Sequence, residues 1–238
     1  MSESPTQTIA FGGETLELLP ERALWWPAAR TLFVADLHLG KAASFRALGQ
    51  PVPHGTTGDN LQRLGDLVAR YPARRLVVLG DLLHAAPARR PRQIEPLRHW
   101  REAHAALDFV AVRGNHDRHA GDPPPELRIR VVDEPWPLDT GSSLSACHHP
   151  QRLPGRAVLA GHWHPAVALR GPARDRMRLP CFCLVGGELL VLPAFGAFTG
   201  SSLREPPEGV LCYAVGGGRV WGPEAWRLPG RGPRTTLA

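Results

Sequence analysis

The stretch TLFVADLH, Thr31 to His38, decides the fold because it joins an apolar run to two polar side chains that suit a metal ion. The run of continuous apolar residues is typical of a strand that is buried on both faces. Asp36 and His38 stand two residues apart, so on an extended chain their side chains leave the same side. The stretch therefore predicts a buried strand whose end can bind one metal ion.

Three further stretches share this form, namely RLVVLGDLL, DFVAVRGNHD and RAVLAGHWH. Between the first two strands, Thr56 or Thr57 is expected to cap a helix that turns Leu61, Leu64 and Leu67 to one face. A second helix is expected from about Gln93 to Ala106. This alternation predicts an α/β fold, in which functional residues gather where the strands end.

The later part of the chain has short strand candidates separated by Gly and Pro: LRIRVVD, SLSACHH, CFCLVGGELLVLP and GVLCYAVGGGRVWG. Gly186-Gly187 has the form of a two-residue hairpin turn. We expect residues 1–222 to form a single domain. Residues 223–238, rich in Pro, Gly and Arg, are expected to be a mobile tail.

Composition narrows the class of protein. Hydrophobic residues make up 43% of the 238, which is enough for a substantial core. The formal net charge of +6 attracts polyanions, although the arginine excess also fits a coding bias. The sequence shows no signal-peptide pattern and no apolar run of about 18 residues, so we expect a cytoplasmic protein without a membrane span.

The four cysteines show no disulfide spacing. Cys181-x-Cys183 has the spacing of half a metal site, but no second pair completes it. The alternative is that these cysteines are small buried apolar residues.

Polar groups follow the apolar runs in a fixed order: Asp36-x-His38, Gly80-Asp81, Gly114-Asn115-His116-Asp117, Cys147-His148-His149 and Gly161-His162-x-His164. One such group alone is usually a turn, but five in order are hard to explain as turns. Imidazole with carboxylate or carboxamide groups favours ions such as Mn, Fe or Zn over Mg or Ca. The set predicts two divalent ions with an aspartate between them, and a water activated by both ions to attack phosphorus in line.

This pattern resembles the calcineurin-like metallophosphoesterases, which carry D-x-H, GD, GNH[DE], H and GHxH in the same order. The resemblance implies a double β-sheet sandwich flanked by helices, with a metal pair at the strand ends. It implies the following roles: Asp36, His38 and His164 bind one ion, Asp81 bridges, Asn115, His148 and His162 bind the other, His116 lies beside the scissile phosphate, and Asp117 orients His116.

Two positions in this pattern stay open. Many family members have Asp or Arg three residues after the bridging aspartate, where this chain has His84. His84 either contacts substrate or is an ordinary loop residue. In the doublet His148-His149 we expect His148 to be the metal ligand, because the strand SLSAC leads directly into it.

A subgroup resemblance concerns the substrate. The stretches DLHLGKAASFRALGQPVPHGTTGDNL, GHWHPA and LVLPAFGAFTG look like those of the bacterial ligase-associated DNA damage response endonucleases, the PdeM subgroup. The resemblance implies a manganese-dependent endonuclease of single-stranded DNA that acts in DNA repair. It also implies functional partners: a helicase, an ATP-dependent DNA ligase and a nuclease of the metallo-β-lactamase type.

Lys41 is the only lysine among 28 basic residues, and it follows the Asp-x-His pair directly. With Arg46 it could bind phosphates that flank the scissile bond. The alternative is a solvated residue in a helical turn. Phe45 could stack on an unpaired base, or it could be buried in the core.

The sequence is compatible with three functions: a DNA phosphodiesterase, a metal-dependent phosphatase or phosphodiesterase of small molecules, and a non-catalytic platform. A DNA substrate predicts a basic strip leading away from the metals, whereas a small substrate predicts a closed pocket. The complete ligand set argues against the platform.

Overall fold

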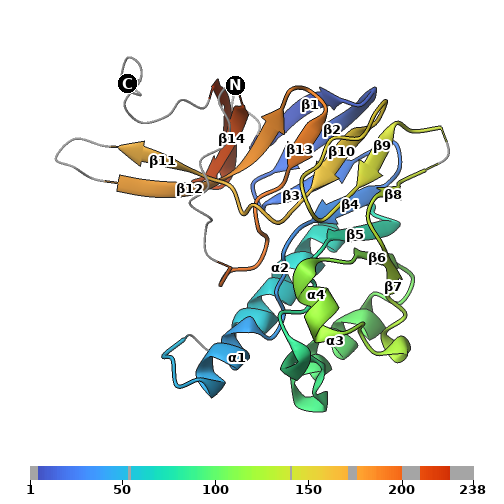
Figure 1. The fold of residues 1–238 in the computed structure, drawn as a ribbon, viewed down its shortest axis with the longest axis vertical. Helices are drawn as coiled ribbons and strands as arrows, with labels where there is room; N and C mark the ends of the chain where they lie inside the picture. Colours follow the sequence, from blue (N-terminus) through green and yellow to red (C-terminus); the bar gives the residue numbers. More distant parts are fainter. Residues whose placement is uncertain (1–4, 53–54, 140, 171–175, 200–209, 226–238) are drawn as a thin grey trace.

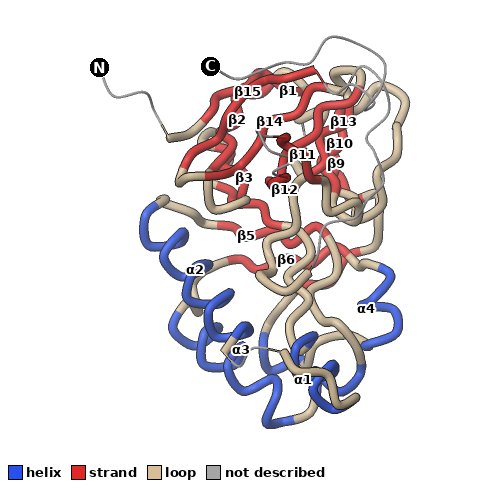
Figure 2. The backbone as a smooth tube through the Cα atoms, turned by 90° about the vertical axis from the view of Figure 1, so that its left-hand side faces the viewer, coloured by secondary structure: helices blue, strands red, loops and turns tan. Residues whose placement is uncertain are grey.

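Two β-sheets pack face to face, and helices cover the outer side of the first sheet (Figure 1). The structure is a computed structural model that describes residues 5–52, 55–139, 141–170, 176–199 and 210–225. Turned by a quarter, the same molecule shows the sheets together at one end and the helices at the other (Figure 2). The double-sheet sandwich predicted from the sequence is confirmed.

The first sheet places the predicted strands side by side. Its strands follow in spatial order β1 (Gln7–Phe11), β2 (Glu14–Leu19), β3 (Ala23–Trp26), β4 (Thr31–Val34), β5 (Arg75–Leu79), β6 (Asp108–Val112) and β7 (Arg130–Val132). The pairs from β1 to β4 are antiparallel, and those from β4 to β7 are parallel. Because β4, β5 and β6 are parallel, their carboxyl ends share one edge.

The helices connect these parallel strands. They are α1 (Lys41–Ala47), α2 (Thr56–Arg70), α3 (Pro91–Ala103) and α4 (Asn115–Ala120), with short 3-10 turns η1 (Ala86–Arg89) and η2 (Pro125–Leu127). As predicted, α2 buries Leu61, Leu64 and Leu67. The expected threonine cap was wrong, because Gly55 precedes the helix in a left-handed conformation and Thr56 is already helical.

The second sheet is formed mainly by the later part of the chain. Its spatial order is β15 (Arg219–Ala225), β14 (Leu211–Gly216), β12 (Arg176–Val185), β13 (Leu189–Val191), β10 (Ala157–Ala160), β9 (Leu144–Ala146) and β8 (Trp136–Pro137), and β11 (Ala166–Arg170) pairs with β12. Gly186 and Gly187 lie in the turn between β12 and β13, but the loop has three residues and not the expected two, because Val185 pairs with Leu189 and Glu188 completes the turn. β15 continues past the expected boundary at Gly222, and residues 226–238 of the expected tail lie outside the described residues.

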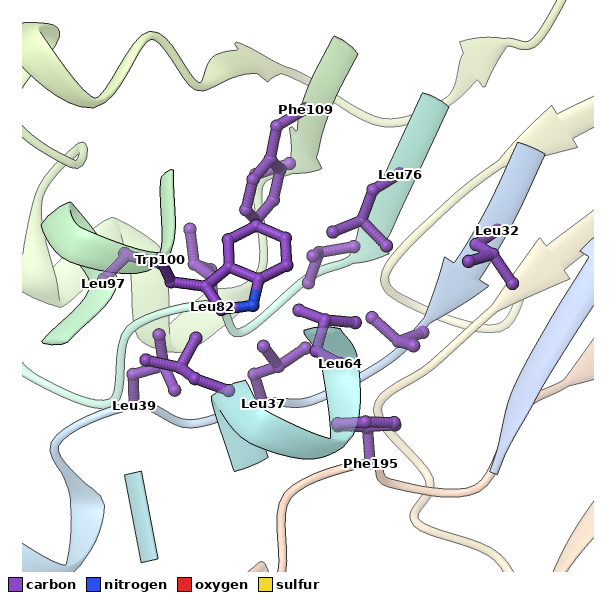
Figure 3. Packing of buried hydrophobic residues seen from close by; sticks show 14 of the residues in the cluster. Leu32, Leu37, Leu39, Leu64, Leu76, Leu82, Leu97, Trp100, Phe109 and Phe195 are labelled. Carbon is purple, nitrogen blue, oxygen red and sulfur yellow. The ribbon is translucent and has the colours of Figure 1, made fainter. Parts of the chain in front are cut away.

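Successive side chains of the central strands point to opposite faces of the first sheet, and each face forms its own core. Leu32 and Val34 of β4 belong to the core cluster on the helix side, together with Leu64 and Trp100. Figure 3 shows Leu32, Leu64 and Trp100 within this cluster. Phe33 and its counterparts in β5 and β6 face the second sheet. Both faces are therefore buried, which explains why these strands read as continuous apolar runs.

None of the described helices is long and apolar enough to cross a membrane.

Candidate metal centre

Five strand ends converge on one edge of the sandwich and bring the predicted metal ligands together. β4 leads into Asp36 and His38, β5 into Asp81, β6 into Asn115, β9 into His148, and β10 into His162 and His164. An isolated parallel bridge from Ala35 to Ala194 joins the two sheets at this edge. The fold itself therefore assembles the ligand set from residues that are more than a hundred positions apart.

The backbone at this edge is strained. Eight non-glycine residues of the described chain have positive φ, and five belong to the predicted ligand set: Asp36, His38, Asp81, His162 and His164. Left-handed backbone is uncommon outside glycine and each case costs of order 1–3 kcal/mol. The left-handed conformation at each strand end accompanies the close approach of these side chains to one another.

Two glycines allow the side chains to approach this closely. A Cβ at Gly80 would lie 2.0 Å from His148 Nδ1, and one at Gly114 would lie 2.2 Å from Asp81 Oδ1. The Gly-Asp and Gly-Asn pairs seen in the sequence are therefore required by space, because any larger residue would displace a ligand.

The first ligand group comprises Asp36, His38 and His164, whose ligand atoms all lie within 4.8 Å of one another. His164 Nε2 lies 3.4 Å from Asp36 Oδ1, and His38 Nε2 lies 3.6 Å from Asp81 Oδ2. Asp36 Oδ1 and both ring nitrogens of His38 are buried without a hydrogen-bond partner. Buried polar atoms are almost always satisfied, so the unpaired Asp36 oxygen and the unprotonated nitrogen of the His38 ring fit a bound cation.

The second group is centred on His148, which is fully buried. Its Nε2 lies 2.9 Å from Asn115 Oδ1, 3.1 Å from His162 Nδ1 and 3.6 Å from Asp81 Oδ1. Asp81 thus lies between the two groups, as expected of a bridging carboxylate.

The structure distinguishes His148 from His149. His148 Nδ1 lies 3.1 Å from the carbonyl oxygen of Leu79, which only accepts hydrogen bonds, so Nδ1 carries the proton and Nε2 is left for a metal. His149 Nδ1 instead contacts Glu134 Oε1 at 2.6 Å. This arrangement leaves His148 Nε2 free for a metal and engages His149 Nδ1 elsewhere, and the choice of His148 as the ligand stays a prediction.

Glu134 was missed by the sequence reasoning. Its Oε2 accepts hydrogen bonds from the backbone amides of His148 at 2.6 Å and His149 at 2.8 Å. Burial opposes ionisation of Glu134, but the hydrogen bonds from His149 and from both amides outweigh it and lower its pKa. Glu134 lies fourteen positions before His148 in the sequence and belongs to no recognisable motif.

Electrostatics at this edge also fit two cations. Burial and the neighbouring Asp36 charge raise the pKa of Asp81 to about 7. Burial, followed by the charge of nearby Lys41, lowers the pKa of His38. Burial and His148 lower the pKa of His162 to about 4. A divalent ion stabilises neighbouring ionised carboxylates and neutral imidazoles, because these are the forms of the two groups that bind it.

His116 and Asp117 follow Asn115 at the start of α4. His116 Nδ1 lies 2.9 Å from the backbone carbonyl of His84, which fixes the ring. The Asp117 carboxylate accepts from the backbone amides of Gly114 at 3.0 Å and Leu83 at 2.9 Å. Asp117 was predicted to orient His116. Its carboxylate contacts backbone amides of the neighbouring loops, whereas the His84 carbonyl contacts the His116 ring itself.

His84 lies inside the site. Its ring stacks on His116 with centroids 4.7 Å apart and meets the His38 ring edge-on at 5.5 Å. Burial, together with the charges of His116 and Lys41, lowers the pKa of His84 to about 4. His84 is thus placed where a substrate contact was proposed.

Lys41, Phe45 and Arg46 lie on α1 at the rim of the site. Lys41 Nζ donates to the carbonyl oxygen of Thr199 at 3.2 Å and lies 6.0 Å from the Phe45 ring centroid. Phe45 is half-buried, and its ring meets Phe198 at 5.6 Å. Arg46 lies in the last turn of the same helix.

A groove of about 220 Å³ opens beside the metal centre. His164 is one wall, and Arg22 and Arg178 lie along it with Pro165 and Ala194. Neither arginine belongs to a motif, so the sequence alone does not show that both line the same groove as His164. The groove therefore carries two guanidinium groups on the walls that it shares with His164.

A second group of ligand-type atoms lies inside the second sheet. Cys183 Sγ lies 3.7 Å from Cys181 Sγ and 3.6 Å from Cys212 Sγ, and all three thiols are buried. Cys212 is thus the third member that the Cys181-x-Cys183 spacing lacked. The group belongs to an apolar cluster with Val158 and Val191.

Comparison with known proteins agrees with this site. The calcineurin-like phosphoesterase family matches residues 29–149. The solved structure of the Pseudomonas putida nuclease MPE superposes with a TM-score of 0.78 at 44% sequence identity, covering 91% of this chain and 98% of that one. A search among curated proteins found no match.

Proposed function

Because this chain belongs to the calcineurin-like phosphoesterase family and is a metal-dependent hydrolase, we propose that it is an endonuclease of single-stranded DNA that acts in DNA repair. The proposal includes manganese as the metal at both positions. One observation carries it: His164 of the Asp/His ligand set forms part of the wall of an open groove that Arg22 and Arg178 also line. A long phosphodiester chain can pass through such a groove, whereas a small ester would be served by a closed pocket.

The residues of the chain divide into those that hold the ions and those that act on the phosphate. Asp36, His38, His164, Asn115, His148 and His162 hold the ions, with Asp81 between the two groups. When bound, the ions supply an activated water and neutralise charge on the phosphoryl oxygens. The strained backbone fixes the ligand positions before substrate arrives, which limits reorganisation during the reaction.

His116 acts on the phosphate from the same edge. Its Nδ1 proton is committed to the His84 carbonyl, so Nε2 is the nitrogen available to the substrate. As an imidazolium, His116 donates a hydrogen bond to a phosphoryl oxygen or a proton to the leaving oxygen. Arg22, Arg178, Lys41 and Arg46 bind flanking phosphates.

The test uses circular single-stranded DNA with manganese, incubated with the parent protein and with His116→Ala. A circle has no ends, so linear products from the parent alone would support an endonuclease. Both proteins are also assayed for metal content, because the variant should retain its metals.

The result that would overturn the proposal is an intact circle together with parent-only hydrolysis of bis-p-nitrophenyl phosphate. That outcome would keep the metal chemistry and assign a small phosphate ester as substrate.

A further inference from the structure

A half-buried aromatic pair stands at the rim of the metal centre, and neither the ion ligands nor the proposed chemistry uses it. Phe45 comes from α1, and Phe198 comes from the segment that follows β13. Their ring centroids lie 5.6 Å apart with planes at 86°. Both rings have intermediate exposure, so part of each stays accessible to a ligand beside the metal centre.

The pair is continuous with the catalytic rings. His116 stacks on His84 at 4.7 Å, and His84 lies 6.1 Å from Phe45. A row of rings therefore leads from the histidine beside the scissile phosphate to the surface. A strand whose phosphate lies at the ions would bring a neighbouring base to this row.

The same backbone positions both the rings and the ion ligands. Gly196 N donates to the Asp36 carbonyl at 3.2 Å, and Ala197 N donates to Asn60 Oδ1 at 3.0 Å. Asn60 is buried in α2, so the segment that carries Phe198 is tied down on two sides. Preorganised rings lose little entropy when a flat ligand stacks on them.

The charge around the pair suits a nucleic-acid strand. Lys41 lies one helical turn before Phe45 on the same face of α1, with Nζ held by the Thr199 carbonyl. A cation beside an aromatic ring is the combination with which proteins bind the backbone and bases of single strands. In a duplex the bases are stacked and paired, so they cannot reach such a ring.

We propose that Phe45 and Phe198 form a stacking site for an unpaired base next to the scissile phosphate. This inference rests on the proposed nuclease function and deepens it, because it names the feature that selects unpaired strands. Stacking on one aromatic ring changes binding by a factor of roughly 5 to 160 per base.

The experiment compares two labelled linear single strands that differ in a central run of thymidines, which in one strand lacks its bases. The expected result for the parent is preferential cutting within the base-containing run, by a factor within that range. Phe45→Leu should lose most of this preference, while Phe45→Tyr should keep it. Leu48→Ala is the control, because Leu48 is the C-cap residue of the same helix and 77% exposed, and the substitution keeps the backbone amide that bonds to the Phe45 carbonyl.

Phe198→Leu is the second variant, and thermal unfolding of each protein shows whether it folds. If Phe45→Leu and Phe198→Leu fold and still discriminate as the parent does, the stacking site is excluded. A parent that cuts neither strand, nor circular DNA, would instead remove the nuclease function on which the inference rests. The two failures are distinguishable because only the first requires an active parent.

Discussion

Two sets of side chains with metal-binding chemistry lie among the described residues, and they differ in backbone conformation and in the pairing of their polar atoms. The Asp/His set stands on loops at the strand ends, where five residues adopt left-handed backbone and Asp36 and His38 leave buried polar atoms unpaired. The thiols of Cys181, Cys183 and Cys212 stand within regular strands, where their sulfur atoms contact one another.

This difference separates a site from a packed core. Strain and unsatisfied buried atoms cost free energy and persist where function requires them. Buried thiols cost little, because cysteine packs as a small apolar residue, and contacts with the neighbouring thiols together with burial raise the pKa of Cys183. Proximity of ligand atoms alone is therefore a weaker indication of a metal site than proximity combined with strain.

The largest effect is expected for Asp81→Asn. The change removes the carboxylate between the two ion groups, so activity should fall by roughly 10³-fold. Because the ion-free protein carries a destabilising charge there, the ion-free variant should melt higher than the ion-free parent, by about 2–4 °C for each kcal/mol relieved. Steady-state kinetics with manganese measures the loss of activity. Calorimetry of the ion-free proteins measures the rise in melting temperature. An ion-free variant that melts lower would contradict this electrostatic account.

Gly80→Ala should be the next most damaging. Its new Cβ would meet the His148 ring at 2.0 Å, so the ligand must move, and a displacement of about 1 Å can cost on the order of 10²-fold in rate. Gly187→Ala is the control, since Gly187 also has positive φ but no atom within 4 Å of the added Cβ. Steady-state kinetics should show a loss only for Gly80→Ala. Equal losses would mean that backbone strain rather than ligand displacement is responsible.

Glu134→Ala tests the missed residue. Without its carboxylate, the backbone amides of His148 and His149 lose their acceptor, and metal affinity should fall by about 10- to 100-fold. Manganese titration monitored by activity measures this shift. Glu126→Ala, an exposed acidic change, should leave the midpoint unchanged. If both variants titrate alike, Glu134 has no role in positioning the ligands.

The smallest effect on activity is expected for Cys183→Ala. Loss of one buried sulfur should lower the free energy of unfolding by about 1–2 kcal/mol, with activity within twofold of the parent. Urea unfolding and kinetics give the two values. A large loss of activity with normal stability would make the thiols part of the site.

The central strands and the metal ligands could be predicted from the sequence, because short local motifs contain both. The apolar run ending in Asp36-x-His38 predicts both the strand and the metal ligands, and the same holds for Gly80-Asp81 and Gly161-His162. The strands β1 to β3 were missed, although Gly12-Gly13 between two alternating stretches is a hairpin signal.

The remainder depends on tertiary contacts. Glu134, Arg22 and Arg178 reach the site only through the packing of the two sheets, and no local pattern marks them. The order of the motifs leaves the doublet His148-His149 open, and only the strand that leads into His148 favours that residue. The hydrogen bonds that Leu79 and Glu134 make add a physical reason that the sequence does not show.

The most direct test of the central claim is the metal content of three proteins: the parent, Asp81→Asn and Cys183→Ala. Each is loaded with manganese, freed of excess metal and analysed by inductively coupled plasma mass spectrometry. The account predicts two ions per chain for the parent and for Cys183→Ala, and fewer than two for Asp81→Asn. Full occupancy in Asp81→Asn with a loss in Cys183→Ala would show that the thiols, and not the strained Asp/His edge, bind the metal.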